Sequence, residues 1–188
     1  MAPVSPARHV VLLGLMSSGK TSIGRRVAER LGRRLIDGDE LLEVRTGRTA
    51  AEIAETEGIE RLHELEAEII LEALTSSEPA VIGPAASVIE IDAVRAALTD
   101  HFVVWLRAPA TYLAERAARK DHRPLLDDGD LLALFEEQLA VREPLAVAMA
   151  HLVLDVNTMP KDALADTIVE RLGASSRSGV RRGRAGHG

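Results

Sequence analysis

The strongest constraint on this chain is the stretch from Gly14 to Thr21, which reads GLMSSGKT. It fits the pattern G-x-x-x-x-G-K-[ST] of a phosphate-binding loop. An apolar run, 9–13, comes directly before it, and a helical pattern, 22–31, follows. The motif requires this order, because the first turn of the helix must direct its free N–H groups at the phosphates. The alternative is an ordinary glycine-containing turn, but the complete motif in its correct context favours a nucleoside triphosphate site.

Each residue type in the loop has a physical reason to be there. Gly14 and Gly19 allow the backbone to wrap closely around an anion. Lys20 is expected to reach the β- and γ-phosphates, and the hydroxyl of Thr21 can hold Mg²⁺. The loop therefore predicts ATP and Mg²⁺ as cofactors.

Length and composition suit one globular domain. The chain has 188 residues, 46% of them hydrophobic and 28% charged. It contains no cysteine, which excludes disulfides, thiol catalysis and cysteine-based zinc sites and is consistent with a cytoplasmic protein. No apolar run approaches the roughly 18 residues of a membrane helix, and residues 1–8 lack the apolar centre of a signal peptide. We expect a cytoplasmic monomer without a membrane partner.

Charge is distributed unevenly along the chain. The net charge is −6, yet the segment 174–188 carries four arginines and no acidic residue. The acidic remainder argues against a nucleic-acid partner. The Gly/Ser/Arg-rich segment 174–188 cannot bury apolar surface, so we predict a disordered basic tail.

Strand-like and helical patterns alternate along the rest of the chain, which predicts a parallel sheet covered on both faces. We expect an α/β fold of the P-loop NTPase type, with a five-stranded parallel sheet flanked by helices, in one domain over residues 1–173. A helical insertion is expected near 40–75 and a lid loop near 116–130. The expected strands are 9–13, 34–36, 80–83, 102–106 and 151–155. The expected helices are 22–31, 40–44, 49–74 with a break near Gly58, 91–98, one from Pro109, 131–149, which Pro144 bends or interrupts, and 160–172.

Two carboxylates follow the second expected strand. Asp37 and Asp39 should lie at the carboxyl edge of the sheet, beside the phosphate loop. One can hold Mg²⁺ through water, and the other can orient or deprotonate an acceptor hydroxyl. The alternative is a turn in which Asp39 caps the helix 40–44. The position beside the loop favours function.

The expected lid is rich in cationic side chains. A cationic lid that closes over the nucleotide would neutralise the charge that develops on the transferred phosphoryl group. The alternative is a solvated charged loop. The residues concerned are Arg116, Arg119, Lys120, His122 and Arg123.

In several strings the chain resembles the shikimate kinase family, over about residues 9–172. These strings occur in the family's order and spacing: the phosphate loop 14–25, Asp37-Gly38-Asp39, Arg45-Thr46-Gly47-Arg48, Arg123-Pro124-Leu125-Leu126 and Val141-Arg142-Glu143-Pro144-Leu145. The resemblance implies a nucleoside-monophosphate-kinase-like fold in which the insertion binds the substrate. It also implies that the enzyme transfers the γ-phosphate of ATP to a hydroxyl of shikimate.

The resemblance also implies roles for single residues. Asp37 would bind the water shell of Mg²⁺, and Asp39 would bind the acceptor's hydroxyls and serve as base. Arg116 would stack on adenine, Arg123 would close onto the phosphates, and Arg142 would bind the acceptor's carboxylate. The phosphates would be bound by Gly14, Ser17, Ser18, Gly19, Lys20, Thr21 and Ser22, and the acceptor also by His63 and Gly83.

Several positions depart from the family pattern, mainly on the acceptor side. His63 stands where the family has an arginine of the carboxylate clamp, and histidine offers fewer donors and is mostly neutral at pH 7. Arg61, two residues away on a helix, should point elsewhere. Gly83-Pro84-Ala85-Ala86 replaces a run of three glycines. Ser17 replaces a loop glycine, which is tolerable if its φ is negative.

These departures leave three alternatives to shikimate phosphorylation. One is a related small-molecule kinase with a gluconate-like or other polyol or acid acceptor. Another is a nucleotide-binding relative without shikimate activity. Retention of Lys20, both aspartates and Arg123 argues against the loss of catalysis. Nucleoside-monophosphate kinase activity is the weakest alternative, because no second arginine pair suits a monophosphate.

Overall fold

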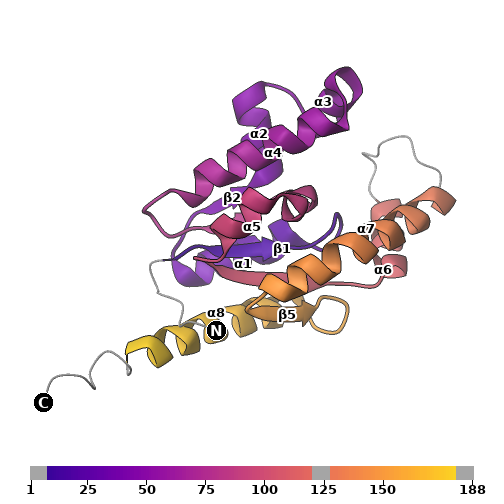
Figure 1. Ribbon diagram of the computed structural model, residues 1–188. Coiled ribbons are helices and arrows are strands. Elements are labelled where there is room, and N and C mark those ends of the chain that lie inside the picture. Colours follow the sequence, from indigo (N-terminus) through magenta and orange to yellow (C-terminus); the bar gives the residue numbers. More distant parts are fainter. Residues whose placement is uncertain (1–7, 120–127, 181–188) are drawn as a thin grey trace, which may run out of the picture.

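The computed structural model describes the backbone of residues 8–119 and 128–180, with side chains in 8–119 and 131–174. Five strands form one parallel sheet in the order β2-β3-β1-β4-β5 (Figure 1). This confirms the predicted fold class. The strands are β1 (Val10–Leu13), β2 (Leu35–Asp37), β3 (Val81–Gly83), β4 (Phe102–Arg107) and β5 (Leu152–Asp155).

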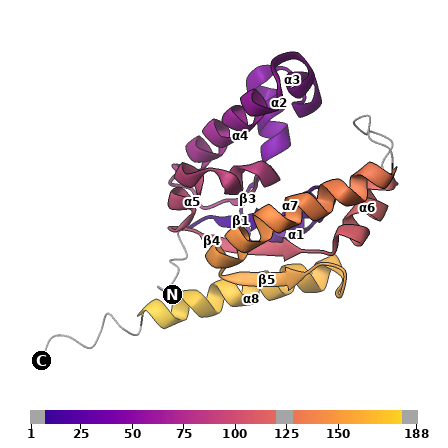
Figure 2. The ribbon, with the colours of Figure 1, turned by 45° about the vertical axis from the view of Figure 1, so that its right-hand side comes forward.

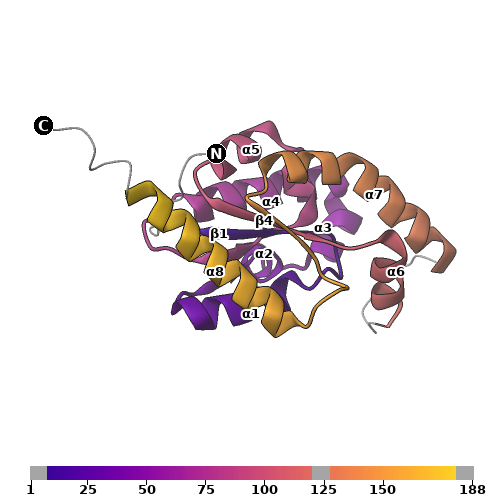
Figure 3. The ribbon, with the colours of Figure 1, turned by 90° about the horizontal axis from the view of Figure 1, so that it is seen from below.

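Helices cover both faces of the sheet (Figures 2 and 3). Helices α1 and α8 lie together on one face, and α4, α5 and α7 on the other. The sheet needs both layers because its strands are apolar on both sides; all four residues of β1 are buried. The helices are α1 (Lys20–Leu31), α2 (Gly38–Thr46), α3 (Ala50–Glu57), α4 (Ile59–Leu74), the 3₁₀ helix η1 (Ala86–Glu90), α5 (Asp92–Leu98), α6 (Ala110–Ala118), α7 (Asp128–Met149) and α8 (Lys161–Val180).

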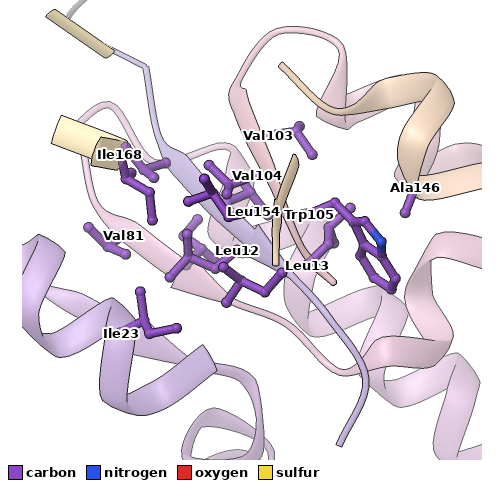
Figure 4. Close-up of a cluster of buried hydrophobic side chains, with 14 of the residues drawn as sticks. Leu12, Leu13, Ile23, Val81, Val103, Val104, Trp105, Ala146, Leu154 and Ile168 are labelled. Carbon is purple, nitrogen blue, oxygen red and sulfur yellow. The ribbon is translucent and has the colours of Figure 1, made fainter. Parts of the chain in front are cut away.

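The core between these layers is mainly aliphatic. Strand residues meet side chains from helices of both faces, such as Ile23 of α1, Ile168 of α8 and Ala146 of α7 (Figure 4). Trp105 of β4 is the largest buried side chain and is 2% exposed. This packing holds the carboxyl ends of the strands, where the site lies, on a rigid support.

The predicted insertion consists of α2, α3 and α4, which extend beyond the edge of the sheet (Figure 1). Thr49 begins α3 with a capping box that it forms with Glu52. Gly58, at a φ of +91°, separates α3 from α4 and confirms the predicted break. A small second core holds the three helices together; its buried members are Leu42, Ile53, Leu62 and Ile69.

The structure corrects the expected cap of α2. The helix begins at Gly38, and its N-cap is Asp37, whose Oδ1 accepts a hydrogen bond from the Asp39 N–H at 3.1 Å. Asp39 is therefore inside the first turn and does not cap. The reason is that β2 runs to Asp37, so the extended backbone that a cap residue needs is found there.

Two other boundaries differ from the prediction. The expected loop 116–130 is helical at both ends, since α6 continues to Ala118 and α7 begins at Asp128. Its middle part, 120–127, lies outside the described residues, and with it Lys120, His122 and Arg123.

Helix α8 continues to Val180, so residues 174–180 of the expected disordered tail are helical. Each residue added to an existing helix forms one further backbone hydrogen bond, so the segment can continue α8 without burying apolar surface. In the described ranges, no helix is both long and apolar enough to cross a membrane.

Candidate active site

The loop 14–19 connects β1 to α1 and bends tightly around its own backbone. Gly19 has a φ of +96°, a conformation in which glycine carries no penalty. A Cβ at Gly14 would lie 2.5 Å from the Oγ of Ser18 and 3.1 Å from the carbonyl oxygen of Leu106, so that position also requires glycine. The loop thus has the compact form that an anion-binding turn needs.

Ser17 does not meet the condition under which it was expected to be tolerated. Its φ is +65°, and it is the non-glycine residue of the described chain with a positive φ. The left-handed conformation costs a residue with a Cβ about 1–2 kcal/mol. The Oγ atoms of Ser17 and Ser18 are also buried without a hydrogen-bond partner among the described residues. The serine at position 17 therefore fits its place less well than a glycine would.

Lys20 folds back over the loop. Its Nζ donates to the carbonyl oxygens of Gly14 at 2.7 Å and Leu15 at 3.2 Å. The ammonium group therefore lies against the backbone of the loop. A triphosphate bound in the loop would find a positive charge already in position.

The side-chain oxygens of Thr21 and Asp37 lie next to each other beside the loop. The Oγ1 of Thr21 donates to the Oδ2 of Asp37 at 2.6 Å, and Asp37 is 9% exposed. Hydroxyl and carboxylate oxygens suit Mg²⁺, which usually takes one or two protein ligands and completes its shell with water and phosphate oxygens. In the described part of the chain, no three His, Asp or Glu side chains gather into a metal site. The hydroxyl of Thr21 and the carboxylate of Asp37 are thus a donor set that fits Mg²⁺.

One cavity of about 700 Å³ joins the loop to the inner face of the insertion. Its volume suits a small-molecule site. Most of the predicted site residues line this cavity, whereas Gly14 and Ser18 are buried and do not line it. The predicted residues in its wall are Ser17, Gly19, Lys20, Thr21, Ser22, Asp37, Asp39, His63, Gly83, Arg116 and Arg142.

His63 and Glu66 enter the cavity from one face of α4. Burial, followed by the positive charge of Arg142, lowers the pKa of His63 below its usual value. Burial raises the pKa of Glu66, and the charge of Asp39 adds to this effect. The Oγ of Ser87 donates a short hydrogen bond to Glu66, which opposes the shift. Burial therefore disfavours the charged forms of both side chains at this end of the cavity.

Arg61 points away from the cavity, as expected from its place on α4. Its guanidinium pairs with glutamates of α3 and α4 on the outer surface, namely Glu57, Glu64 and Glu68. Arg61 therefore does not replace the arginine that is missing at position 63.

Arg142 comes from α7 and is paired within the chain. Its Nε donates to the Oε1 of Glu90 at 2.6 Å, and its side chain is only 11% exposed. Glu90 is the last residue of η1 and is 40% exposed. The guanidinium thus lines the cavity while it contacts a carboxylate of the protein itself.

The segment 83–86 forms the wall between the phosphate loop and η1. Gly83, Pro84, Ala85 and Ala86 all line the cavity. A Cβ at Gly38 would lie 3.2 Å from backbone atoms of this segment, so the first turn of α2 packs closely on it. The two methyl groups and the proline ring narrow the cavity at this point.

Arg116 lines the cavity from α6. Its guanidinium lies 5.4 Å from the centre of the Tyr112 ring, and its Nη1 donates to the Tyr112 hydroxyl at 2.9 Å. The flat guanidinium is thereby held in one orientation. Arg123, another expected lid arginine, lies outside the described residues.

Sequence reasoning did not identify several residues that shape the cavity. Glu66 lies three residues after His63, which places both on one helical face, and this spacing was a usable signal. Gln138 lies four residues before Arg142 in the same relation. Ser87, Glu90 and Lys161 reach the site through loop and helix packing, for which the sequence carries no local signal.

The chain is similar to shikimate kinases. A family model for shikimate kinase matches residues 16–173. The shikimate kinase of Mycobacterium avium is 37% identical over 169 residues, which cover 90% of this chain and 96% of the relative. That of Symbiobacterium thermophilum is 34% identical over 166 residues, which cover 87% and 95%. Among solved structures, shikimate kinase from Acinetobacter baumannii in complex with shikimate has a TM-score of 0.83 and 29% identity, over 90% of this chain and 95% of that chain.

The family match covers most of the chain, and both relatives are matched over nearly their whole length. The architecture agrees with this match, because the phosphate loop, the paired aspartates and the helical insertion surround one cavity. The chain therefore belongs to the shikimate kinase family and is a phosphotransferase.

Proposed function

We propose that this protein transfers the γ-phosphoryl group of ATP to a hydroxyl of shikimate, which forms 3-phosphoshikimate. One observation carries the proposal: the phosphate loop, Asp39 and Arg142 line the same cavity. A donor phosphate and an acceptor hydroxyl bound there would be neighbours. Phosphoryl transfer depends mainly on such positioning and on charge stabilisation.

The donor half would hold ATP with Mg²⁺. The loop N–H groups and Lys20 would bind the phosphates, while Thr21 and Asp37 would hold the ion directly or through its water shell. When bound, Mg²⁺ neutralises charge on the phosphate oxygens. Arg116 would contact the adenine, and Arg123 is proposed to close over the phosphates.

The acceptor half begins at Asp39. This carboxylate is proposed to hold the acceptor hydroxyl and to take its proton as the oxygen attacks the γ-phosphorus. ADP then leaves with the former bridging oxygen. Glu66, with its raised pKa, lies close enough to interact with Asp39 and would help to orient the hydroxyls. Arg142, with His63 and the Gly83 backbone, would contact the acceptor's far end.

The direct test is ADP release from Mg-ATP by the purified protein, with and without millimolar shikimate. Shikimate-dependent release with formation of a phosphorylated product supports the proposal. Lys20→Ala should abolish this release while the far-ultraviolet circular dichroism stays unchanged, and Arg61→Ala is the control, because Arg61 faces outward. If ATP binds and shikimate does not increase ADP release, the acceptor is a different polyol or acid, or catalysis is lost.

We further propose that residues 1–173 act as one kinase domain and that the enzyme works as a monomer in the cytoplasm, where its donor ATP is available. One chain supplies the phosphate loop and the groups proposed for both substrates. Sedimentation of the active enzyme at assay concentration tests the monomer.

A further inference from the structure

Arg142 has a carboxylate partner that is not a substrate. It lines the same cavity as the phosphate loop, and the Oε1 of Glu90 accepts from its Nε at 2.6 Å. A planar guanidinium binds a carboxylate best through two parallel N–H groups, and the Nε edge provides one such pair. Glu90 occupies that edge.

The two nearby titratable side chains, His63 and Glu66, do not replace the positive charge of Arg142 that Glu90 neutralises. His63 interacts with both members of the pair, and burial together with Arg142 disfavours its protonated form. Glu66, on the same face of α4, adds acidic character and also interacts with Arg142. The positive charge of Arg142 therefore already faces a carboxylate of the protein, that of Glu90.

We propose that Glu90 is a specificity-determining residue: it competes with an acceptor carboxylate for Arg142 and thereby weakens the binding of anionic acceptors. The inference rests on the proposed function, since it concerns the acceptor of that reaction. An uncharged acceptor with the same hydroxyls has no need of Arg142 and escapes the competition.

The exposure of Glu90 allows its side chain to turn away from Arg142 when an acceptor carboxylate binds. Arg142 is 11% exposed and held by its surroundings, whereas Glu90 is 40% exposed at the end of a short 3₁₀ helix. A carboxylate that turns away from the pair regains water at little cost. The apparent dissociation constant of an anionic acceptor rises as the fraction of protein with an available guanidinium falls. If Glu90 holds Arg142 for about nine-tenths of the time, the loss in affinity is about tenfold.

The test compares Glu90→Gln with the unchanged protein on two acceptors, shikimate and its methyl ester. Glutamine keeps the size of the side chain and removes its charge. The KM for shikimate should fall about tenfold in this variant, whereas the KM for the ester changes less than about twofold and kcat stays the same. Glu64→Gln, on the outer face of α4, is the matched control and should alter neither KM.

Calorimetric titration of shikimate into both proteins with ADP present measures the same difference without turnover. An unchanged or weaker affinity for shikimate in Glu90→Gln overturns the inference and shows that Glu90 orients Arg142. Equal gains for shikimate and the ester also overturn it, because the effect would then lie in the shape of the cavity. If neither acceptor is phosphorylated while Glu90→Gln binds shikimate about tenfold more tightly, the proposed function is refuted, but the competition between Glu90 and the acceptor carboxylate is supported.

Discussion

Two substitutions of Asp37 should distinguish its structural role as a helix cap from its proposed role in catalysis, because each role has its own measurable effect. Asp37 caps α2 through the Asp39 N–H and accepts from the Thr21 hydroxyl at 2.6 Å. In Asp37→Asn the amide oxygen can still accept from the Asp39 N–H, and the amide NH2 can donate to the Thr21 hydroxyl in place of the present bond. Asparagine caps as well as aspartate, so the unfolding free energy should change by less than about 1 kcal/mol. In Asp37→Ala the lost cap costs about 1 kcal/mol and the unpaired hydroxyl about as much, or about 2 kcal/mol together.

The activity of Asp37→Asn should fall strongly although its stability changes little. Loss of a carboxylate that orients a metal ion or its water shell typically lowers metal affinity or activity by about 10–100-fold. We therefore expect Asp37→Asn to lower kcat/KM by that factor and to raise the Mg²⁺ concentration for half-maximal rate. Asp39→Asn is the control: it should lower kcat without shifting the Mg²⁺ dependence.

Urea unfolding and Mg²⁺ titrations of the ATPase rate measure the two effects separately. If Asp37→Asn retains the full rate and the normal Mg²⁺ dependence while Asp37→Ala loses stability, the expected part of Asp37 in Mg²⁺ binding is wrong. Asp37 would then serve only as a helix cap.

Three further predictions concern stability. Burial, followed by the charge of His9, lowers the pKa of His101 to about 4. The unfolded chain therefore binds more protons than the folded protein between pH 6.5 and 4, so the unfolding free energy should fall as the pH drops through that range. The expected loss is about 1 kcal/mol from pH 7 to 5 after allowance for solvent screening. His101→Gln should flatten this dependence in urea unfolding, and parallel losses in both proteins would exclude the mechanism. Thr49→Ala breaks the capping box with Glu52 and should cost about 1 kcal/mol, whereas Thr49→Ser should cost little. Ser17→Gly should raise the unfolding free energy by up to about 1 kcal/mol, measured by thermal unfolding, because it removes a left-handed serine; a loss of stability would show that the serine is favourably held.

The phosphate loop was predictable because its chemistry is local. Eight consecutive residues contain the glycines, the lysine and the hydroxyl, and the flanking periodicities identify the strand and the helix. The position of Asp37 and Asp39 beside the loop was also predictable, since the carboxyl ends of parallel strands share an edge. The order of the elements therefore determined the donor half of the site.

Errors arose where one local signal competed with another. The cap of α2 was assigned to Asp39, although Asp37 has the same side chain two residues earlier. The backbone decided between them, because only the residue that ends β2 is extended. The φ of Ser17 likewise depends on the path of the loop between β1 and α1, which composition does not reveal.

By itself, the sequence determined the family, the parallel sheet and the phosphate loop, because each depends on residues that are neighbours in the chain or on the order of elements. Only the tertiary structure decided the character of the acceptor end. Glu66, Ser87, Glu90 and Arg142 come from α4, η1 and α7, and their pairings exist only after these elements pack together. The pKa shifts of His63 and Glu66 follow from the same packing, because burial disfavours the charged form of each side chain.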